Sequence, residues 1–167
     1  MNIYFLRHGI AISRSTRGCT SDATRPLTNK GRSKLLAAAR AMKKMKLKFD
    51  KILSSPYERA KQTAQLIAKE LRTSGEIIYT PALAPTSDSW SVIRAVHNLS
   101  PHPTNVLLVG HEPLLSTTIS ILLAGKPNLQ LKLKKGGLAK LSVRRLRSGS
   151  CARLNWLLTP AQMKRMK

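Results

Sequence analysis

Short apolar runs alternate along the chain with longer segments whose apolar residues repeat every three or four positions. The three runs followed most directly by such segments are Ile3–Leu6, Ile52–Leu53 and Val106–Val109. A continuous apolar run bounded by turn residues is typical of a strand that is covered on both faces. The alternation predicts an α/β domain, a three-layer α/β/α arrangement around a mostly parallel sheet.

Three helices are predicted from apolar stripes with helical spacing. The stripes contain Leu35, Leu36, Ala39 and Met42; then Ala60, Ala64, Ile67, Ala68 and Leu71; then Leu114, Leu115, Thr118, Ile119 and Leu122. Thr28 is suited to cap the first helix, and Pro56 and Pro113 stand where the start of a helix tolerates proline. We also expect Glu76 to begin a strand and Asp88 to open a helix.

Near the C-terminus the pattern changes to alternation of apolar and polar residues. The apolar positions on either side of the turn Arg147–Ser150 are Leu141, Val143, Leu154, Trp156 and Leu158. Such alternation across a turn predicts an antiparallel hairpin. Thr159 and Pro160 then open a short basic helix. Because the chain shows no internal repeat and no linker rich in Pro, Gly or Ser, we expect residues 1–167 to form a single domain.

Polar residues follow each of the three apolar runs. Arg7, His8 and Gly9 follow the first run, Arg59 lies in the segment after the second, and His111 follows the third. The carboxyl ends of parallel strands share one edge of a sheet, where the crevice between the loops is the usual ligand site. We therefore expect two histidines and two arginines to converge at this edge.

This set of side chains suits a phosphoryl group. Arg7 and Arg59 can bind its oxygens through planar forks of N–H donors. A neutral imidazole such as that of His8 can attack phosphorus near pH 7, since the ordinary pKa of histidine is about 6.5. The second imidazole, from His111, can donate a hydrogen bond or a proton to the developing charge. Gly9 lets the backbone come close to a ligand.

Other interpretations of these residues are structural or metal-binding. A lone histidine after a strand is often a capping residue, and a lone arginine in a charged helix is often solvated. Zinc is disfavoured because His8 and His111 lack nearby His, Cys or carboxylate partners and lie close to arginines, which repel a cation. We therefore expect no metal and no cofactor. His97 and His102 are interpreted as surface residues.

The chain is strongly basic, with 30 Lys and Arg against 7 Asp and Glu and a net charge of +23. This charge attracts many kinds of anion and does not choose among them. Surface positions that could receive an acidic phosphoprotein, or simply be solvated, include Lys132, Lys134, Lys135, Arg144, Arg145 and Arg147. A nucleic-acid-binding protein with a vestigial phosphate pocket is an alternative of a different class. Few aromatic residues and no recognisable binding motif count against it.

The expected environment is the cytoplasm. Cys19 and Cys151 form no CxxC pair, so neither a zinc knuckle nor a redox dithiol is indicated, and a reducing compartment fits. Arg7 and His8 interrupt the first apolar run too early for a secretory signal. The longest apolar stretch, Leu114–Ala124, is too short for a bilayer, which needs about 20 helical residues. We expect a monomer without membrane contact.

Three segments, in this order along the chain, resemble the histidine phosphatase superfamily, whose fold is phosphoglycerate-mutase-like. They are Leu6–Gly9, Ser55–Thr63 and Val109–Pro113. More narrowly, the chain is similar to the small phosphohistidine phosphatases of the SixA type. The further matches are Ala11, Asp22–Thr28 with Gly31, Asn155–Trp156 and Thr159–Pro160.

The resemblance implies that His8 becomes phosphorylated, that Arg7, Arg59 and His111 form the phosphate pocket, and that no metal takes part. Arg25 and Thr28 would border the site. For these two residues, contact with substrate and a plain salt-bridge or capping role are both open.

One departure from the superfamily concerns the leaving group. Many members carry a Glu or Asp that protonates an alcohol, whereas this chain has Pro81–Pro85 at the comparable place. An alkoxide leaves poorly without a proton, but the imidazole of phosphohistidine departs more readily and can take a proton from solvent or from His111. The missing acid therefore favours a phosphohistidine substrate, and the positive charge of the chain adds the expectation that the phosphorylated protein is acidic. A broad phosphatase of small phosphate esters is the alternative within enzymes.

Overall fold

The computed structural model describes residues 1–15, 21–73, 76–147 and 149–166. Two residues discussed above lie outside the described residues: Cys19, and Ser148 of the expected C-terminal turn. The strands are β1 (Asn2–Arg7), β2 (Lys51–Ser54), β3 (Ile77–Tyr79), β4 (Asn105–Gly110), β5 (Leu138–Val143) and β6 (Ala152–Leu158). The helices are α1 (Asn29–Lys44), α2 (Glu58–Leu71), α3 (Ser89–His97), α4 (Leu114–Ala124) and α5 (Pro160–Arg165), with a short 3-10 helix at Pro81–Leu83.

The strands form one sheet in the order β3-β2-β4-β1-β5-β6. The neighbours among β1 to β4 are parallel, whereas β5 and β6 form the expected antiparallel hairpin and β5 runs antiparallel to β1. Arg7 at the end of β1 lies beside Gly110 at the end of β4, and Ser54 at the end of β2 lies beside Val109. The carboxyl ends of these three strands are therefore neighbours at one edge of the sheet.

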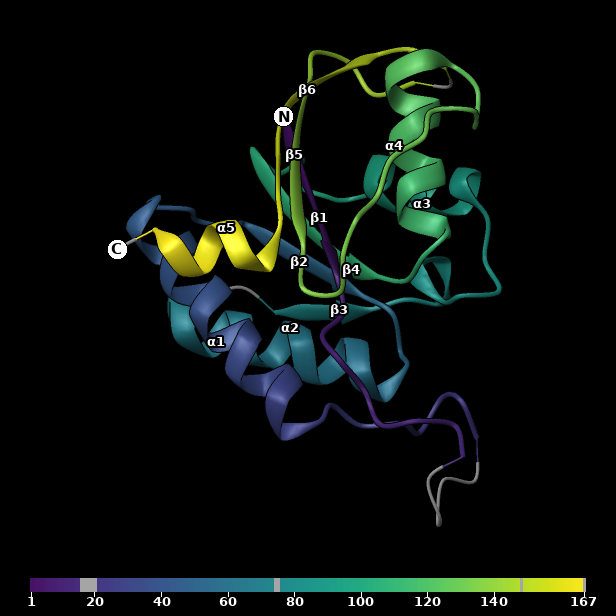
Figure 1. The fold of residues 1–167 in the computed structure, drawn as a ribbon. Coiled ribbons are helices and arrows are strands. Elements are labelled where there is room, and N and C mark those ends of the chain that lie inside the picture. Colours follow the sequence, from purple (N-terminus) through teal and green to yellow (C-terminus); the bar gives the residue numbers. More distant parts are fainter. Residues whose placement is uncertain (16–20, 74–75, 148, 167) are drawn as a thin grey trace.

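Helices cover both faces of the sheet (Figure 1). On one face α1, α2 and α5 pack over a core that includes Leu6 and Leu107, and on the other face α3 and α4 pack over a core that includes Phe5 and Leu108. Successive residues of β1 and β4 thus enter opposite cores, which is why both strands read as continuous apolar runs. The expected three-layer arrangement is confirmed.

Two helices and one strand begin at or close to the positions expected from their capping and flanking residues. The side chain of Thr28 accepts a hydrogen bond from the backbone N–H of Gly31 and caps α1. Asp88 caps α3 in the same way. Glu76 lies just before β3, which begins at Ile77.

The two prolines expected at helix starts differ in position. Pro113 is the N-cap of α4, and Pro56 lies two residues before the first residue of α2. Thr159 opens α5 with a reciprocal capping box to Gln162. Among the described residues, none of the helices is long and apolar enough to cross a membrane.

Candidate active site

His8 is the first residue after β1 and is almost fully buried. Its backbone N–H donates to the carbonyl of Gly110 at 3.1 Å, and its side-chain Nδ1 lies 2.6 Å from the carbonyl oxygen of Gly9. A carbonyl oxygen only accepts, so the proton of the neutral ring belongs on Nδ1 and the lone pair on Nε2. That lone pair accepts a hydrogen bond from Nε of Arg59 at 3.2 Å.

The charge state of His8 suits attack on phosphorus. Burial, with smaller contributions from Arg59 and Arg7, lowers the pKa of His8 to about 3. The ring is therefore neutral at pH 7. A neutral imidazole has a free nitrogen lone pair, which is what a nucleophile requires.

Arg59 lies in the first turn of α2 and is buried beside His8. Its Nη1 donates to the backbone carbonyl of Asp22 at 2.6 Å, and its Nη2 donates to the Asp22 carboxylate at 2.9 Å. The guanidinium plane is thus held by Asp22 on one side and by His8 on the other. A fixed plane of this kind suits binding of phosphoryl oxygens.

Asp22 also contacts Arg14 at 2.8 Å and Arg25 at 2.7 Å. Burial raises the pKa of Asp22, but hydrogen bonds from Arg14, Arg25 and Arg59 outweigh burial and hold the pKa well below its usual range. The carboxylate is therefore ionised near pH 7 and is not a proton donor there. Sequence reasoning gave Asp22 no role, although it is one of only seven carboxylates and lies three residues before Arg25.

Arg25 and Gly9 lie at the site, but their contacts are mainly within the protein. Nε of Arg25 donates to the carbonyl of Ile12 at 2.8 Å, so Arg25 reaches the site through its other contact, the Asp22 carboxylate. The N–H of Gly9 donates to Oγ1 of Thr63 at 3.1 Å. A Cβ on Gly9 would come within 2.6 Å of the end of the Leu35 side chain, so a larger residue there would require Leu35 to move.

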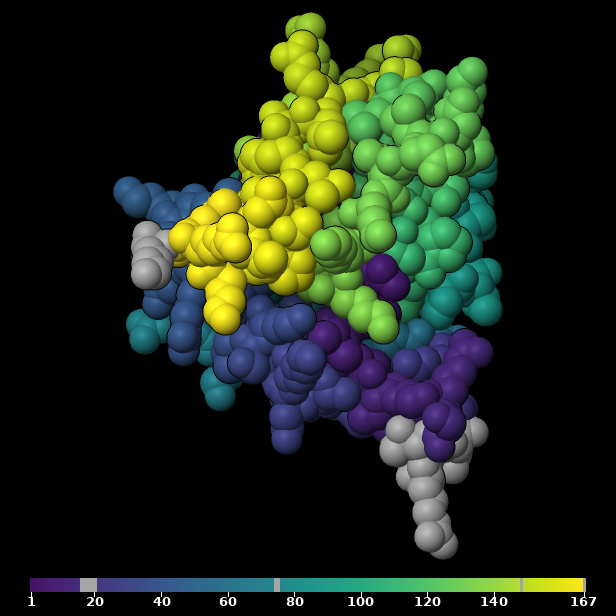
Figure 2. All heavy atoms as spheres, viewed as in Figure 1, coloured from purple at the N-terminus to yellow at the C-terminus, as the bar shows by residue number. Residues whose placement is uncertain are grey.

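Arg7 ends β1 and approaches the site from the side of β5. Its Nη1 donates to the carbonyl of Leu133 at 3.0 Å, whereas its Nε is buried without a hydrogen-bond partner among the described residues. The backbone N–H of Gly136 contacts the carbonyls of both Arg7 and His8, at 2.9 and 3.1 Å. The N-terminal segment (purple) and the segment before β5 (light green) meet at the surface in Figure 2. A buried charged donor without a partner favours an anionic ligand.

His111 follows β4 directly and is buried, with its ring centroid 4.9 Å from that of His8. Its Nε2 lies 2.8 Å from Oγ of Ser55, and its Nδ1 is buried without a hydrogen-bond partner in the described part of the chain. The ring of Tyr57 meets His111 edge-on at 5.3 Å. Burial, followed by the charges of His8 and Arg59, lowers the pKa of His111 to about 3, so this ring is also neutral at pH 7.

Lys135 is a further cation near the site. Burial and the nearby Arg7, Arg25 and Arg59 lower its pKa. From the sequence, Lys135 was predicted only to be one of several basic surface residues, without a place near the site. Its proximity to the site follows from the hydrogen bonds that tie Gly136 to the end of β1.

The four side chains expected to converge are therefore together: His8, Arg7, Arg59 and His111 lie at the shared edge of β1, β2 and β4. Within the described ranges there is no group of three or more His, Cys, Asp or Glu residues placed to hold a metal ion.

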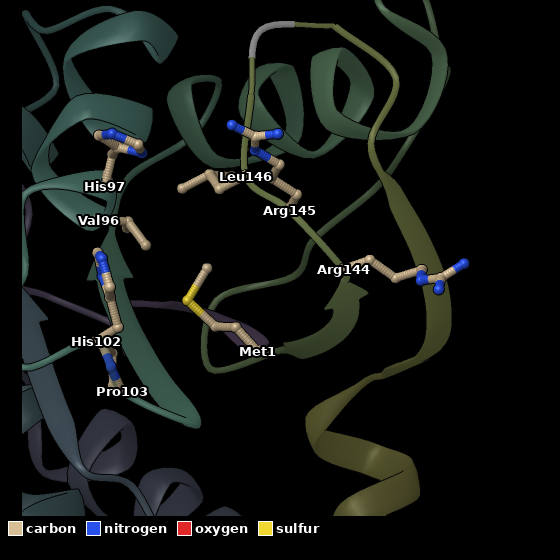
Figure 3. Close-up of a pocket in the computed structure, with 8 residues that line it drawn as sticks. All are labelled: Met1, Val96, His97, His102, Pro103, Arg144, Arg145 and Leu146. Carbon is tan, nitrogen blue, oxygen red and sulfur yellow. The ribbon is translucent and has the colours of Figure 1, made fainter.

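A separate hollow of about 340 Å³ lies at the opposite edge of the sheet (Figure 3). It is lined by Met1, Val96, His97, His102, Pro103, Arg144, Arg145 and Leu146. Met1 precedes β1 and Pro103 lies shortly before β4, so this hollow is at the amino ends of the strands, away from His8. His97 and His102 are exposed there, as the sequence predicted.

Comparison with known proteins identifies the class of protein. Residues 3–86 match the model of the histidine phosphatase superfamily, branch 1. An uncharacterized protein of Picosynechococcus sp. is 34% identical over 143 residues, which make up 84% of this chain and 84% of the relative. The chain belongs to the histidine phosphatase superfamily and is a phosphatase.

Within this class the chain is similar to the SixA phosphatases. Phosphohistidine phosphatase SixA of Escherichia coli is 26% identical over 168 residues, which cover 100% of this chain and 99% of that protein. The structure of protein histidine phosphatase SixA complexed with tungstate superposes with a TM-score of 0.81 at 24% identity, covering 96% of this chain and 98% of that one. The expected phosphoglycerate-mutase-like fold is confirmed.

Proposed function

We propose that this phosphatase removes the phosphoryl group from phosphohistidine in proteins, with His8 as the nucleophile. The observation that carries the proposal is the state of His8. Its ring is buried and neutral, Nδ1 is bound to the carbonyl of Gly9, and the lone pair on Nε2 faces the Nε–H of Arg59. This arrangement places a nucleophile beside donors for phosphoryl oxygens.

The reaction proceeds in two steps. In the first, Nε2 of His8 attacks phosphorus, so that a new P–N bond forms while the P–N bond of the substrate breaks. The departing imidazole takes a proton from solvent. Arg7 and Arg59 bind the non-bridging oxygens, and His111 donates a hydrogen bond to one of them as charge develops.

In the second step, water attacks the phosphorus bound to His8. The bond between phosphorus and Nε2 breaks, inorganic phosphate leaves, and the attacking water gives up a proton to solvent. His8 returns to the neutral form with its proton on Nδ1. The same cations stabilise this step, because both transfers place negative charge on the same oxygens.

The proposal of a phosphohistidine substrate rests on the lack of a suitable carboxylic acid to protonate an alcohol leaving group. Pro81–Pro85 contributes none, and Asp22 is ionised by its arginine partners. Glu112 accepts a hydrogen bond from the backbone N–H of Ser116 at the start of α4. An imidazole leaving group does not need a strong acid, unlike an alcohol. The similarity to SixA phosphohistidine phosphatases supports the same choice, and the net charge of +23 favours an acidic protein partner.

We also infer that the catalytic domain takes in the whole of residues 1–167. The family match ends at residue 86, yet β4, which lies between β2 and β1, and β5 with β6 come from the second half of the chain. His111 comes from that half as well. The sheet and the site therefore both need segments beyond the matched region.

The test is to trap the intermediate. The enzyme is incubated with a protein carrying ³²P-labelled phosphohistidine, and acid-labile label is sought on His8 by peptide mapping. His8→Ala should lose both the label and turnover, whereas His97→Ala, an exposed histidine at the opposite edge, should keep both. Turnover by His8→Ala at the wild-type rate would overturn the assignment. Equal turnover of a sugar phosphate and the phosphohistidine protein would overturn the substrate class.

A further inference from the structure

Ser55 is the first residue after β2, and its side chain is completely buried beneath His111. Among the described residues, its Oγ makes two hydrogen bonds. The backbone N–H of Tyr57 donates to it at 3.2 Å, and Nε2 of His111 lies 2.8 Å from it. The direction of the second hydrogen bond decides which nitrogen of His111 carries the proton.

The direction follows from counting donors and acceptors. A serine hydroxyl has one proton to donate and two lone pairs. The amide of Tyr57 can only donate, so it uses one lone pair of Ser55. If Nε2 of His111 also donated, the hydroxyl proton would be buried without an acceptor, which folded proteins avoid. Ser55 therefore donates to Nε2, and the proton of the neutral His111 ring belongs on Nδ1.

We propose that Ser55 is a positioning residue that holds the proton of His111 on Nδ1, so that His111 presents a hydrogen-bond donor to the phosphoryl group. The role toward phosphate rests on the function proposed above. Nδ1 of His111 and Nε of Arg7 are the two buried side-chain nitrogens without a partner among the described residues, and the His8 ring is 4.9 Å from the His111 ring. Both orphan donors thus belong to residues of the site.

The arrangement has a chemical consequence. Because burial keeps the His111 ring neutral at pH 7, the ring donates a hydrogen bond and does not release a proton. A neutral ring without Ser55 would divide its population between two tautomers, and the one with its lone pair on Nδ1 would repel a phosphoryl oxygen. The hydroxyl of Ser55 selects the productive tautomer before substrate binds, which is preorganisation.

The direct test is ¹⁵N NMR of the wild-type protein with labelled histidine at pH 7. The signals of His111 are assigned by their absence in His111→Gln. We expect a protonated shift for Nδ1 and an unprotonated shift for Nε2. A protonated Nε2 in the wild-type protein would overturn the inference, and this measurement depends neither on a Ser55 variant nor on activity.

The kinetic test compares two adjacent, equally buried hydroxyls. Ser55→Ala should lower kcat by about tenfold, the equivalent of one lost hydrogen bond, and weaken binding of inorganic phosphate. Ser54→Ala should change neither, because the Ser54 hydroxyl donates to the carbonyl of Ser55 and not to a ring. Ser55→Thr, which keeps a hydroxyl, should restore the wild-type tautomer in the NMR spectrum. Equal kinetics of Ser55→Ala and Ser54→Ala would overturn the inference.

The two proposals can fail separately. If His8→Ala remained active, the proposed nucleophile would be wrong, while the tautomer of His111 would still be read from the wild-type spectrum. If His8→Ala were inactive but Nε2 of His111 carried the proton, only the role of Ser55 would be lost.

Discussion

The Nε–H of Arg59 donates to Nε2 of His8 across 3.2 Å, so the cation that is proposed to bind phosphate is already in contact with the nucleophile. Nε2 has one lone pair, so this hydrogen bond must break when Nε2 bonds to phosphorus, and the N–H is then free to donate to a phosphoryl oxygen beside it. Donors that are fixed before the reaction stabilise developing charge without a cost of reorganisation. The value of Arg59 therefore lies in its geometry as well as in its charge.

Arg59→Lys should lower kcat/KM by about 100-fold or more, the cost of losing one fixed donor at the reacting group. Lysine keeps the charge but cannot reach His8 and both acceptors of Asp22 with a planar fork. Steady-state kinetics on the phosphohistidine protein provide the measurement. Arg32→Lys is the matched control, since Arg32 is exposed and its Nη2 donates to Oε1 of Gln62. A variant within threefold of wild type would show that charge alone suffices.

Asp22→Asn should also impair the enzyme, by about tenfold in kcat/KM. The substitution keeps the shape but weakens the charge-assisted contacts that hold Arg59. Steady-state kinetics on the phosphohistidine protein provide the measurement. An increase in turnover would contradict this prediction, because it would mean that Asp22 competes with substrate for Arg59.

Acid should destabilise the fold through the two buried histidines. The folded-state pKa values of His8 and His111 are about 3, below the ordinary value of about 6.5. The unfolded chain therefore binds protons below pH 6.5 that the folded chain does not. The free energy of unfolding should fall between pH 6.5 and 3 by up to about 1.4 kcal/mol per pH unit for each histidine, with no such loss above pH 6.5.

Urea unfolding of the wild-type protein and of His111→Gln at pH 7, 6, 5 and 4 would check the dependence. The variant lacks one of the two groups, so its stability should fall less steeply with acid. Equal slopes for the two proteins would be inconsistent with a buried neutral His111.

Gly31→Ala should lower the free energy of unfolding by about 1–3 kcal/mol, the usual cost of overpacking. A Cβ at this position of α1 would lie 2.2 Å from the carbonyl oxygen of Ile10, which is backbone and cannot rotate away. Thermal unfolding measures the effect. Ser33→Ala, on an exposed position of the same helix, should change stability by less than about 0.5 kcal/mol. Equal stability of the two variants would contradict the contact.

Lys135→Ala should raise the KM for the phosphohistidine protein several-fold, whereas the neighbouring Lys134→Ala should not. Both lysines are exposed, and for Lys135 partial burial and the nearby charges of Arg7, Arg25 and Arg59 lower the pKa, which places its ammonium beside the site. The difference should shrink as salt is added, because exposed charges are screened. Titrating KM against ionic strength for the two variants provides the measurement, and identical curves would contradict the prediction.

The strand ends could be predicted from the sequence because a strand buried on both faces must be apolar throughout. Phe5 and Leu6 enter opposite cores, and so do Leu107 and Leu108. The polar residues that follow such runs lie at the sheet edge whatever the rest of the chain does. The convergence of the two histidines and two arginines followed from topology alone.

The contacts that hold Arg59 and His111 in place could not be predicted from the apolar pattern. Arg59 contacts Asp22, which lies 37 residues away in the connection between β1 and α1, and no periodic pattern determines the path of that connection. The role of Ser55 depends on the orientation of one hydroxyl. Gly9 was interpreted as making room for a ligand, whereas its contacts show that it also makes room for Leu35.

The central position of β1 sets His8 apart from Asp22 and Arg25 in the way each is held in the fold. This strand is hydrogen-bonded along both sides, to β4 and β5, and His8 follows it directly, so the backbone of His8 is well anchored. Asp22 and Arg25 instead belong to the connection that joins β1 to α1, whose two ends are linked by a β-bridge between Ala11 and Leu27. Because Asp22 holds Arg59, a change in this connection alters the placement of the arginine, while pairing of β1 on both sides keeps the backbone of His8 where it is.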